Sequence, residues 1–291
     1  MERIRGLRRL CREYDPDVVL SFMCEPNFRA LLATVGLRAK CVVSVRNDPA
    51  REYAGRSGRF VGKVLMPLLA DACVLQTSRA AKWFPMLLQK KSTVIPNAVA
   101  EEFFNVRPDA GGSYWIAVGR LVEQKNYSMM LRAFRDVVDE LPEEQLRIYG
   151  EGDWRERLQE MSEELGLAGN VTFCGATRDV AGALAGAKGF LLASDYEGMP
   201  NALMEALAMG VPCVSTDCPC GGPAGLIEDG VNGFLVRVGD ADGMAKAAIH
   251  LSENPEERQR IGVEARLRAL DFKPERVFPR WRELLVSVCA R

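Results

Sequence analysis

The chain has 291 residues, of which 48% are hydrophobic and 26% are charged. These values are typical of a globular protein with one large domain or two smaller ones. They argue against a membrane-spanning protein, since no run approaches the roughly 20 apolar residues that a bilayer requires. Residues 1–15 also lack the apolar segment of a signal peptide, so we expect a cytoplasmic protein.

The charge is unevenly distributed along the chain. Residues 1–110 carry 18 Lys/Arg and 11 Asp/Glu, whereas the remainder carries 20 and 28. A basic half predicts an anionic partner, such as a membrane surface or a phosphorylated acceptor, and a solvated face without a partner is the alternative. Nucleic acid is not expected, because the arginines are scattered and are not interleaved with aromatic residues.

The nine cysteines do not predict disulfides, because their number is odd and the chain shows no export signal. Four of them lie inside apolar runs, where cysteine packs as a small hydrophobic residue: Cys41, Cys73, Cys174 and Cys213. Cys218 and Cys220 lack the nearby histidine and the second cysteine pair of a zinc site, so we expect no metal there.

Short β-branched runs alternate with helical segments through the whole chain, which opens on a basic amphipathic helix. Such alternation predicts parallel sheets with helices on both faces. The expected strands are DVVLSF, CVVSVR, ACVLQT and STVIPN before residue 98, then YWIAVG, LRIYG, VTFCG, GFLLAS, VPCVST and GFLVR. The expected helices lie near 27–37, 59–70, 126–141, 154–166, 179–187, 201–210 and 222–230, and from 241 to the end with a break at Pro274.

This pattern predicts an α/β fold with two Rossmann-like domains, the second of which has six strands. Residues 98–112 have no strong period and read as a linker. We expect an incomplete first domain at 1–103, a nucleotide-binding domain at 104–271, and a last helix at 272–291 that crosses back to the first domain.

The stretch SDYEGMPNALMEALAMGVPCVST, which begins at Ser194, holds the candidate chemistry. The loop after GFLLAS lies at the carboxyl edge of a parallel sheet, where ligands bind. The helix start suits a phosphate, Gly198 lets a backbone approach closely, and Pro200 suits an early helical position. Glu205, one turn inside the helix, can accept hydrogen bonds from both hydroxyls of a ribose, and Glu197 would lie near the group that is attached beyond the phosphates. The alternative is that these two acids bind no ligand and only stabilise the helix N-terminus through the helix dipole.

A second pair of residues follows the strand YWIAVG, which ends at Gly119. Arg120 and Lys125 lie after this strand and can clamp a diphosphate at the same edge. A Rossmann oxidoreductase is not expected, because no G-x-G-x-x-G follows a strand.

These motifs, with IYGEGDWRERL, VTFCGATRDV and GPAGLIEDGVNGFLVRVGD, resemble glycosyltransferase family 4, retaining enzymes of the GT-B fold with two domains facing across a cleft. The resemblance covers residues 15–290 and is most specific in 115–240. It implies that Arg120 and Lys125 hold the donor diphosphate, that Glu205 binds the ribose and that Glu197 contacts the donor sugar. VIPNAV at 94–99 resembles the interdomain hinge of the family. The implied donor-binding residues are Gly119, Arg120, Lys125, Gly198, Met199, Pro200, Asn201 and Glu205.

The resemblance implies transfer of a hexosyl or N-acetylhexosaminyl group from a nucleotide sugar, with UDP as the favoured nucleotide, and no other cofactor. The leaving diphosphate would be stabilised by Arg120, Lys125 and helix N–H groups without a metal. Asp240 and Asp242 form a D-x-D string, and we expect it to cap a helix. The motif SVRNDP resembles members that elongate lipid-diphosphate-linked or cell-surface glycans, with Arg46 and Asn47 facing the cleft. The family resemblance as a whole implies catalytic roles for Glu197, Arg120, Lys125 and Arg46. It also implies peripheral association with the inner face of the membrane.

Two departures from the family pattern lead to further expectations. Compared with the family, the sequence lacks the strand with the Gly-rich loop and the next strands, so we expect a truncated first domain with an exposed sheet edge or apolar face. A non-catalytic nucleotide-sugar-binding remnant is the alternative function. The second departure concerns a histidine that several family members place in the first domain near the sugar. The only histidine here, His250, lies on a late helix of the second domain and is expected to be structural.

Overall fold

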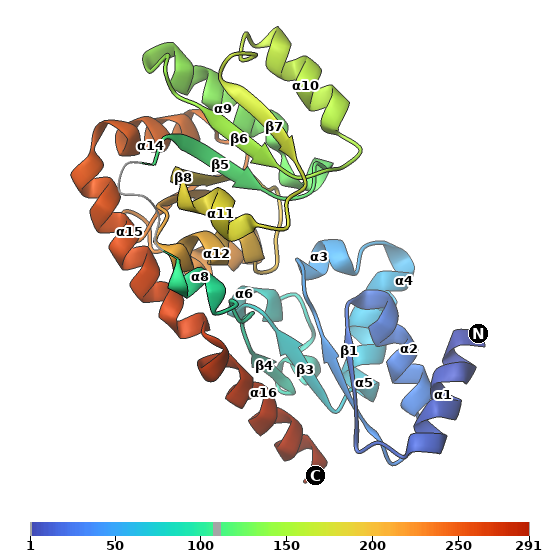
Figure 1. Cartoon of the computed structure of the whole chain (residues 1–291). Helices are drawn as coiled ribbons and strands as arrows, with labels where there is room; N and C mark the ends of the chain where they lie inside the picture. The colour runs from blue at the N-terminus through green and yellow to red at the C-terminus, as the bar shows by residue number, and fades with distance from the viewer. Residues whose placement is uncertain (1, 107–111, 291) are drawn as a thin grey trace. The chain divides into compact units, whose positions relative to one another are not determined.

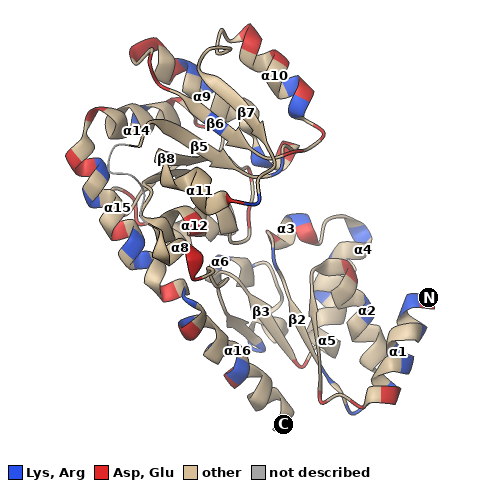
Figure 2. Ribbon diagram, in the orientation of Figure 1, with Lys and Arg blue, Asp and Glu red and all other residues tan. Residues whose placement is uncertain are grey.

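The computed structural model describes residues 2–106 and 112–290, which include two compact units. Unit 1 comprises Met1–Ala98, Pro219–Gly221 and Glu275–Arg291, and unit 2 comprises Val99–Cys218 and Gly222–Pro274. The predicted domain bounds 1–103, 104–271 and 272–291 stay a prediction. Figure 1 shows the elements of each unit, and Figure 2 shows that charged residues lie mainly on helices and loops.

Unit 1 is built on a four-stranded parallel sheet in the order β1-β2-β3-β4. The four predicted strands of this half are confirmed, as is the basic opening helix α1 (Glu2–Tyr14). The strands are β1 (Val18–Phe22), β2 (Lys40–Ser44), β3 (Ala72–Leu75) and β4 (Ser92–Val94).

Each face of this sheet is covered by helices. On one face, buried residues such as Val43 and Leu75 pack against α2 (Cys24–Thr34) and the helical segment 55–69. On the other face, Val42 and Val74 pack against α16 (Pro274–Cys289). The expected bare apolar face is therefore covered by α16, whereas Phe22 at the end of edge strand β1 is 40% exposed.

Unit 2 contains a six-stranded parallel sheet in the order β10-β9-β8-β5-β6-β7. In chain order this is the 3-2-1-4-5-6 arrangement of a dinucleotide-binding sheet, and all six predicted strands are confirmed. The strands are β5 (Tyr114–Val118), β6 (Leu146–Tyr149), β7 (Val171–Gly175), β8 (Ala187–Leu192), β9 (Cys213–Thr216) and β10 (Phe234–Val236).

Helices cover both faces of the unit 2 sheet and form two buried clusters. One cluster involves α9 (Tyr127–Glu140), α10 (Arg155–Glu164) and α14 (Ala241–Glu253). The other involves α8 (Glu102–Asn105), α11 (Val180–Ala185), α12 (Asn201–Met209), α13 (Gly222–Leu226) and α15 (Pro255–Ala269). The amphipathic pattern of α9 explains its burial, since Met130, Phe134 and Val137 recur at helical spacing on the side that packs on the sheet.

Three sequence expectations are corrected here. Part of the predicted linker 98–112 is structured, because Phe103 and Phe104 of α8 are buried in unit 2, while residues 107–111 lie outside the described residues. Cys174 is exposed rather than buried, because β7 is the edge strand of its sheet. The C-terminal helical region has a second break at Asn254, where Pro255 begins α15.

Gly222 provides a test of backbone packing. A Cβ atom there would lie 1.8 Å from the carbonyl oxygen of Gly198, whereas a Cβ at Gly225 of the same helix meets nothing within 4 Å. We expect Gly222→Ala to lower the free energy of unfolding by about 1–3 kcal/mol, the usual cost of overpacking. Gly225→Ala should be neutral or stabilising, since alanine is the better helix former. Urea unfolding of both variants checks this, and equal stabilities would contradict it.

Candidate functional site

The strand order of unit 2 reverses between β5 and β8, and the loops that follow these two strands are bonded to each other. Gln124 donates its side-chain amide to the carbonyl of Tyr196 at 2.8 Å, and its own carbonyl accepts the Asp195 N–H at 2.9 Å. The Asn126 amide donates to Asp195 Oδ1 at 2.7 Å. Ligands of open parallel sheets bind at such a switch point, beyond the carboxyl ends of the strands.

An ion pair joins two of the predicted catalytic residues at this point. Lys125 Nζ lies 2.6 Å from Glu197 Oε1, and the two side chains are only 15% and 10% exposed. The Ser194 hydroxyl donates to the same carboxylate oxygen at 2.8 Å. Lys125 and Glu197 are 72 positions apart, so the sheet topology brings them together.

The other predicted residues after β5 lie beside this pair. Gly119 continues directly from the strand, and a Cβ there would be 3.3 Å from Lys125 Cε, so the lysine side chain lies against the glycine. Arg120 follows and is exposed. One cation is therefore held against Glu197, and a second is presented to solvent at the same edge of unit 2.

The loop before α12 places the remaining predicted donor-binding residues. Met199 is 8% exposed and packs in the core of unit 2, so only its backbone is available to a ligand. Pro200 is the residue before the helix, with ψ of 115°, rather than an early helical residue. Gly198 is buried, and Asn201, the first helical residue, is exposed.

Glu205 lies one turn inside α12, as the sequence predicts. Burial raises the pKa of its carboxyl group, and the charge of Glu102 on α8 raises it further. Its ionised form is therefore poorly solvated. Hydroxyl donors from a ligand would stabilise that form.

Asp240 acts as a helix cap, as expected. Its side chain accepts the N–H of Gly243 at 2.8 Å at the start of α14. Asp242 pairs with Lys246 at 2.8 Å on the exposed side of the same helix. His250 Nε2 lies 2.8 Å from Glu257 Oε2, which fits the structural role expected of it.

In unit 1, a second group of polar side chains lies at the carboxyl ends of the strands. Arg46 follows β2, lies over the Phe22 ring at 5.6 Å, and donates to Asn97 Oδ1. Gln76, after β3, donates to the same oxygen at 2.8 Å. Burial lowers the pKa of the Arg46 guanidinium. Three strand ends thus contribute to one polar cluster.

Glu52, on the short helix α3 (Pro49–Glu52), holds the turn that follows β2. Its Oε2 accepts the backbone N–H groups of Arg46 at 3.0 Å and Asn47 at 2.9 Å. Burial raises the pKa of this carboxyl group to about 7, partly offset by those two hydrogen bonds and by the Arg46 charge.

Several atoms of this cluster are buried without a hydrogen-bond partner among the described residues: Ser44 Oγ, Arg46 Nη1, Glu52 Oε1 and Gln76 Oε1. Buried polar atoms normally have partners, so such a group suits a polar ligand or water. The sequence indicated Arg46 and Asn47, but not Ser44, Glu52, Gln76 or Asn97. Gln76 could have been found from the sequence, because it is the polar residue that directly follows an apolar strand.

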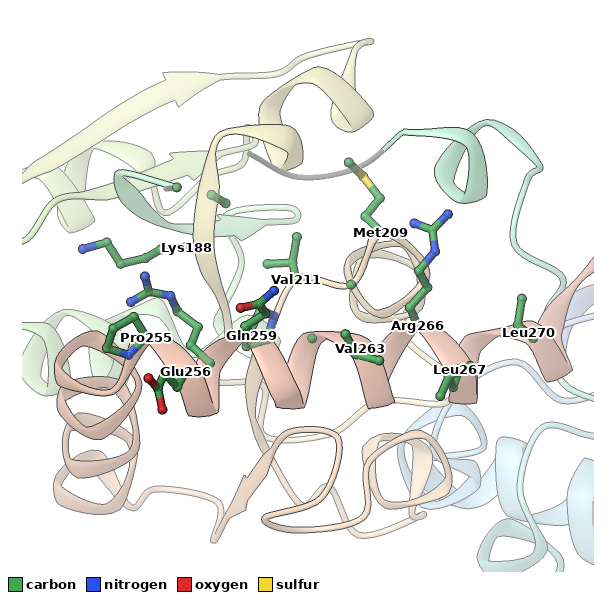
Figure 3. Close-up of a pocket in the computed structure, with 16 residues that line it drawn as sticks. Lys188, Met209, Val211, Pro255, Glu256, Gln259, Val263, Arg266, Leu267 and Leu270 are labelled. Carbon is green, nitrogen blue, oxygen red and sulfur yellow. The ribbon is translucent and has the colours of Figure 1, made fainter. Parts of the chain in front are cut away.

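A cavity of about 690 Å³ also lies in unit 2, but away from these residues (Figure 3). It lies at the amino end of β8 and against α15, as Lys188 and Val263 show. None of the predicted site residues lines it.

Comparison with known proteins identifies the family. Residues 99–268 match the family model described as glycosyl transferases group 1. The chain belongs to this family. It is 26% identical over 249 residues to an uncharacterized glycosyltransferase of Methanocaldococcus jannaschii, covering 76% of this chain and 60% of that protein. The chain thus spans less than two thirds of that relative.

Two further similarities cover nearly the whole chain. A Campylobacter jejuni α-1,4-N-acetyl-D-galactosaminyltransferase, whose name specifies a PP-undecaprenol-linked glycan, is 26% identical over 97% of this chain and 78% of its own length. The crystal structure of Anabaena HepE in complex with UDP has a TM-score of 0.86 at 18% identity, covering 98% of this chain and 82% of that one. This likeness shows the fold alone, and it confirms the predicted α/β GT-B fold.

Glu52 gives a prediction about pH. Its pKa in the folded chain, about 7, is above the ordinary value of 4.5. Between these values the folded state binds the proton that the unfolded state has lost, so the stability contributed by protonated Glu52 is lost as pH rises. We expect the urea midpoint of the unit 1 transition to fall from pH 5 to pH 8. The fall should be smaller in Glu52→Gln, which stays neutral; identical pH profiles would contradict this assignment.

Proposed function

We propose that the chain is a retaining glycosyltransferase that moves a sugar from a nucleoside-diphosphate donor, with UDP as the nucleotide, to a glycan or lipid-linked acceptor. The reaction would serve polysaccharide or glycoconjugate synthesis at the inner face of the membrane. The observation that carries the proposal is the Lys125–Glu197 pair at the switch point of a six-stranded parallel sheet. Membership in glycosyl transferases group 1 supports the reaction class.

Unit 2 would bind the donor. An ammonium group has three N–H donors, so Lys125 can keep Glu197 and still bind a phosphate oxygen. Exposed Arg120 would bind the other phosphate, and Glu205 would accept the ribose hydroxyls. Together these cations would stabilise the negative charge that develops on the leaving diphosphate without a metal ion.

The donor sugar would lie near Glu197. Its carboxylate is fixed by Lys125 and Ser194, so it is oriented before the substrate arrives. Such a fixed acceptor can bind sugar hydroxyls without reorganising during the reaction. We assign Glu197 to orienting the donor sugar, and retention of the anomeric configuration stays part of the proposal.

Unit 1 would bind the acceptor. Arg46 offers a charged donor, while Gln76 and Glu52 offer acceptor oxygens, and all three present unpartnered atoms in the described cluster. A sugar hydroxyl both donates and accepts hydrogen bonds, and it therefore suits this mixture. The names of the Campylobacter jejuni relatives support a lipid-linked glycan as the acceptor class. The HepE complexes with UDP and with UDP-glucose support the donor class.

Glu205→Gln tests the ribose assignment. It removes the anionic acceptor of two hydroxyl groups, and we expect UDP affinity to fall at least about tenfold, since charge-assisted hydrogen bonds are the stronger ones. Calorimetric titration with UDP measures the change. Glu163→Gln, at an exposed position of α10, is the matched control and should bind as the wild type does. Unchanged affinity in Glu205→Gln would refute the assignment.

Lys125→Ala tests the diphosphate assignment. The variant should lose UDP affinity by about tenfold or more and uridine affinity much less, because only UDP offers phosphate oxygens. Lys246→Ala removes an exposed, paired lysine and serves as the charge-matched control. Equal losses for UDP and uridine would show that Lys125 acts on the folding of the loop instead.

Transfer assays with UDP-sugars, with and without EDTA, test turnover and metal dependence of the wild type. UDP binding without turnover would indicate a non-catalytic chain.

A further inference from the structure

Unit 1 presents an apolar stripe on a helical segment that the proposed reaction does not use. The segment runs without interruption through α4 (Gly55–Phe60), the π-helix η1 (Val61–Leu65) and α5 (Met66–Leu69). Its inner side is buried against the sheet through Val61 and Met66. Its outer side exposes Phe60, Val64 and Leu68, spaced by four residues and 53%, 38% and 65% exposed.

A neighbouring helix adds to this surface. The helix α7 (Met86–Gln89) contacts α5, and it exposes Met86 and Leu87 by 63% and 49%. We call the five side chains Phe60, Val64, Leu68, Met86 and Leu87 the apolar patch. Single exposed apolar residues are ordinary, but several on adjacent helices mark an interaction surface.

Basic residues are numerous in the part of the chain that carries the apolar patch. Residues 53–91 contain seven Lys/Arg and one acid, Asp71, a net charge of +6. Asp71 Oδ2 accepts the Cys41 N–H at 2.8 Å, and its other oxygen lies 3.6 Å from Lys40, which is outside this segment. Six of the seven cations are exposed. Arg56, Arg59 and Lys63 lie on the same helical segment as the stripe, and Lys82 and Lys90 lie close to α7 in the sequence.

No ion pair within the described residues offsets the charge of the cations on the helical segment. In the described parts of the chain, no carboxylate forms an ion pair with Arg59 or Lys63. Lys63 Nζ instead lies 4.0 Å from the centre of the Trp83 ring. Its pKa is lowered by partial burial of the ammonium group and then by the positive charge of Arg59. An anionic partner would offset both charges.

We infer that the apolar patch and the cations Arg56, Arg59 and Lys63 dock unit 1 onto an anionic lipid bilayer. Apolar side chains with flanking Lys and Arg fit the boundary between acyl chains and anionic headgroups. The inference rests on the proposed function in one respect, because a lipid-linked acceptor would be reached at that surface. The docking itself is a property of unit 1 and does not require catalysis. Among the described residues no helix is long and apolar enough to cross a bilayer.

Vesicle co-sedimentation of the full chain tests this inference. Wild type should bind vesicles of phosphatidylcholine with phosphatidylserine, and binding should weaken with salt and on pure phosphatidylcholine. Phe60→Asp combined with Leu68→Asp should reduce the partition coefficient by at least about tenfold, since apolar burial is lost and negative charge is added. Arg59→Glu with Lys63→Glu should remove the preference for phosphatidylserine.

The controls are exposed residues of unit 2. Leu267→Asp, at a leucine that is 54% exposed on α15, and Lys246→Glu, on α14, should leave vesicle binding unchanged. UDP titration of every variant confirms that unit 2 is folded. Vesicle binding without UDP binding would defeat the proposed function and keep this inference, whereas UDP binding without vesicle binding would do the reverse.

Three outcomes overturn the inference: wild type fails to bind anionic vesicles, the patch variants bind as well as wild type, or the controls lose binding equally. Self-association that Leu68→Asp abolishes, in the absence of vesicle binding, would assign the patch to a second copy of the chain instead.

Discussion

The candidate donor site depends on one buried ion pair, Lys125 with Glu197. Removing two charges from water costs free energy, which their attraction offsets only when the geometry is good and further hydrogen bonds are made. Ser194 supplies one such bond, at 2.8 Å, to the shared oxygen of Glu197. Separating the two residues would leave each charge buried without a partner, which is costly. The pair is therefore stable only while both loops keep their positions.

Hydrogen bonds between the two loops and close backbone packing hold them in those positions. Gln124 and Asn126, the two neighbours of Lys125 in the sequence, bond to Tyr196 and Asp195, which directly precede Glu197. A Cβ atom at Gly150, at the end of β6, would lie 1.8 Å from the carbonyl oxygen of Gly119, so the backbones beyond β5 and β6 are in direct contact. The carboxyl edge of unit 2 is thus shaped by backbone packing, and the side chains are oriented on it.

Much of this arrangement was predictable from the sequence. All ten strands were predicted from the sequence. Parallel strands with helices on both faces have continuous apolar, β-branched sequences, which differ clearly from the periodic pattern of an amphipathic helix such as α9. The convergence of Lys125 and Glu197 followed from one rule, that the carboxyl ends of parallel strands share an edge. Both predictions depend on local patterns or on topology, and neither needs the positions of individual atoms.

The unit 1 cluster was not predictable in the same way. Ser44, Glu52, Gln76 and Asn97 come from four separate segments, and each is an ordinary polar residue in its own stretch of sequence. Glu52 acts by capping the backbone of Arg46 and Asn47, an interaction that depends on how the chain turns after β2. Burial of Cys174 was predicted wrongly for a related reason, since the position of β7 at the sheet edge is a property of the whole topology.

The charge asymmetry of the sequence has a structural explanation. Residues 1–110 carry an excess of seven positive charges, and residues 53–91 alone carry an excess of six. Most of the excess therefore comes from α4, η1 and the residues that flank α7, and apolar side chains are exposed on these elements and on α5. A basic surface that contacts only water does not explain why Phe60 and Leu68 are exposed beside the cations. Their coincidence with the cations favours one anionic, partly apolar surface as the partner over dispersed contacts with water.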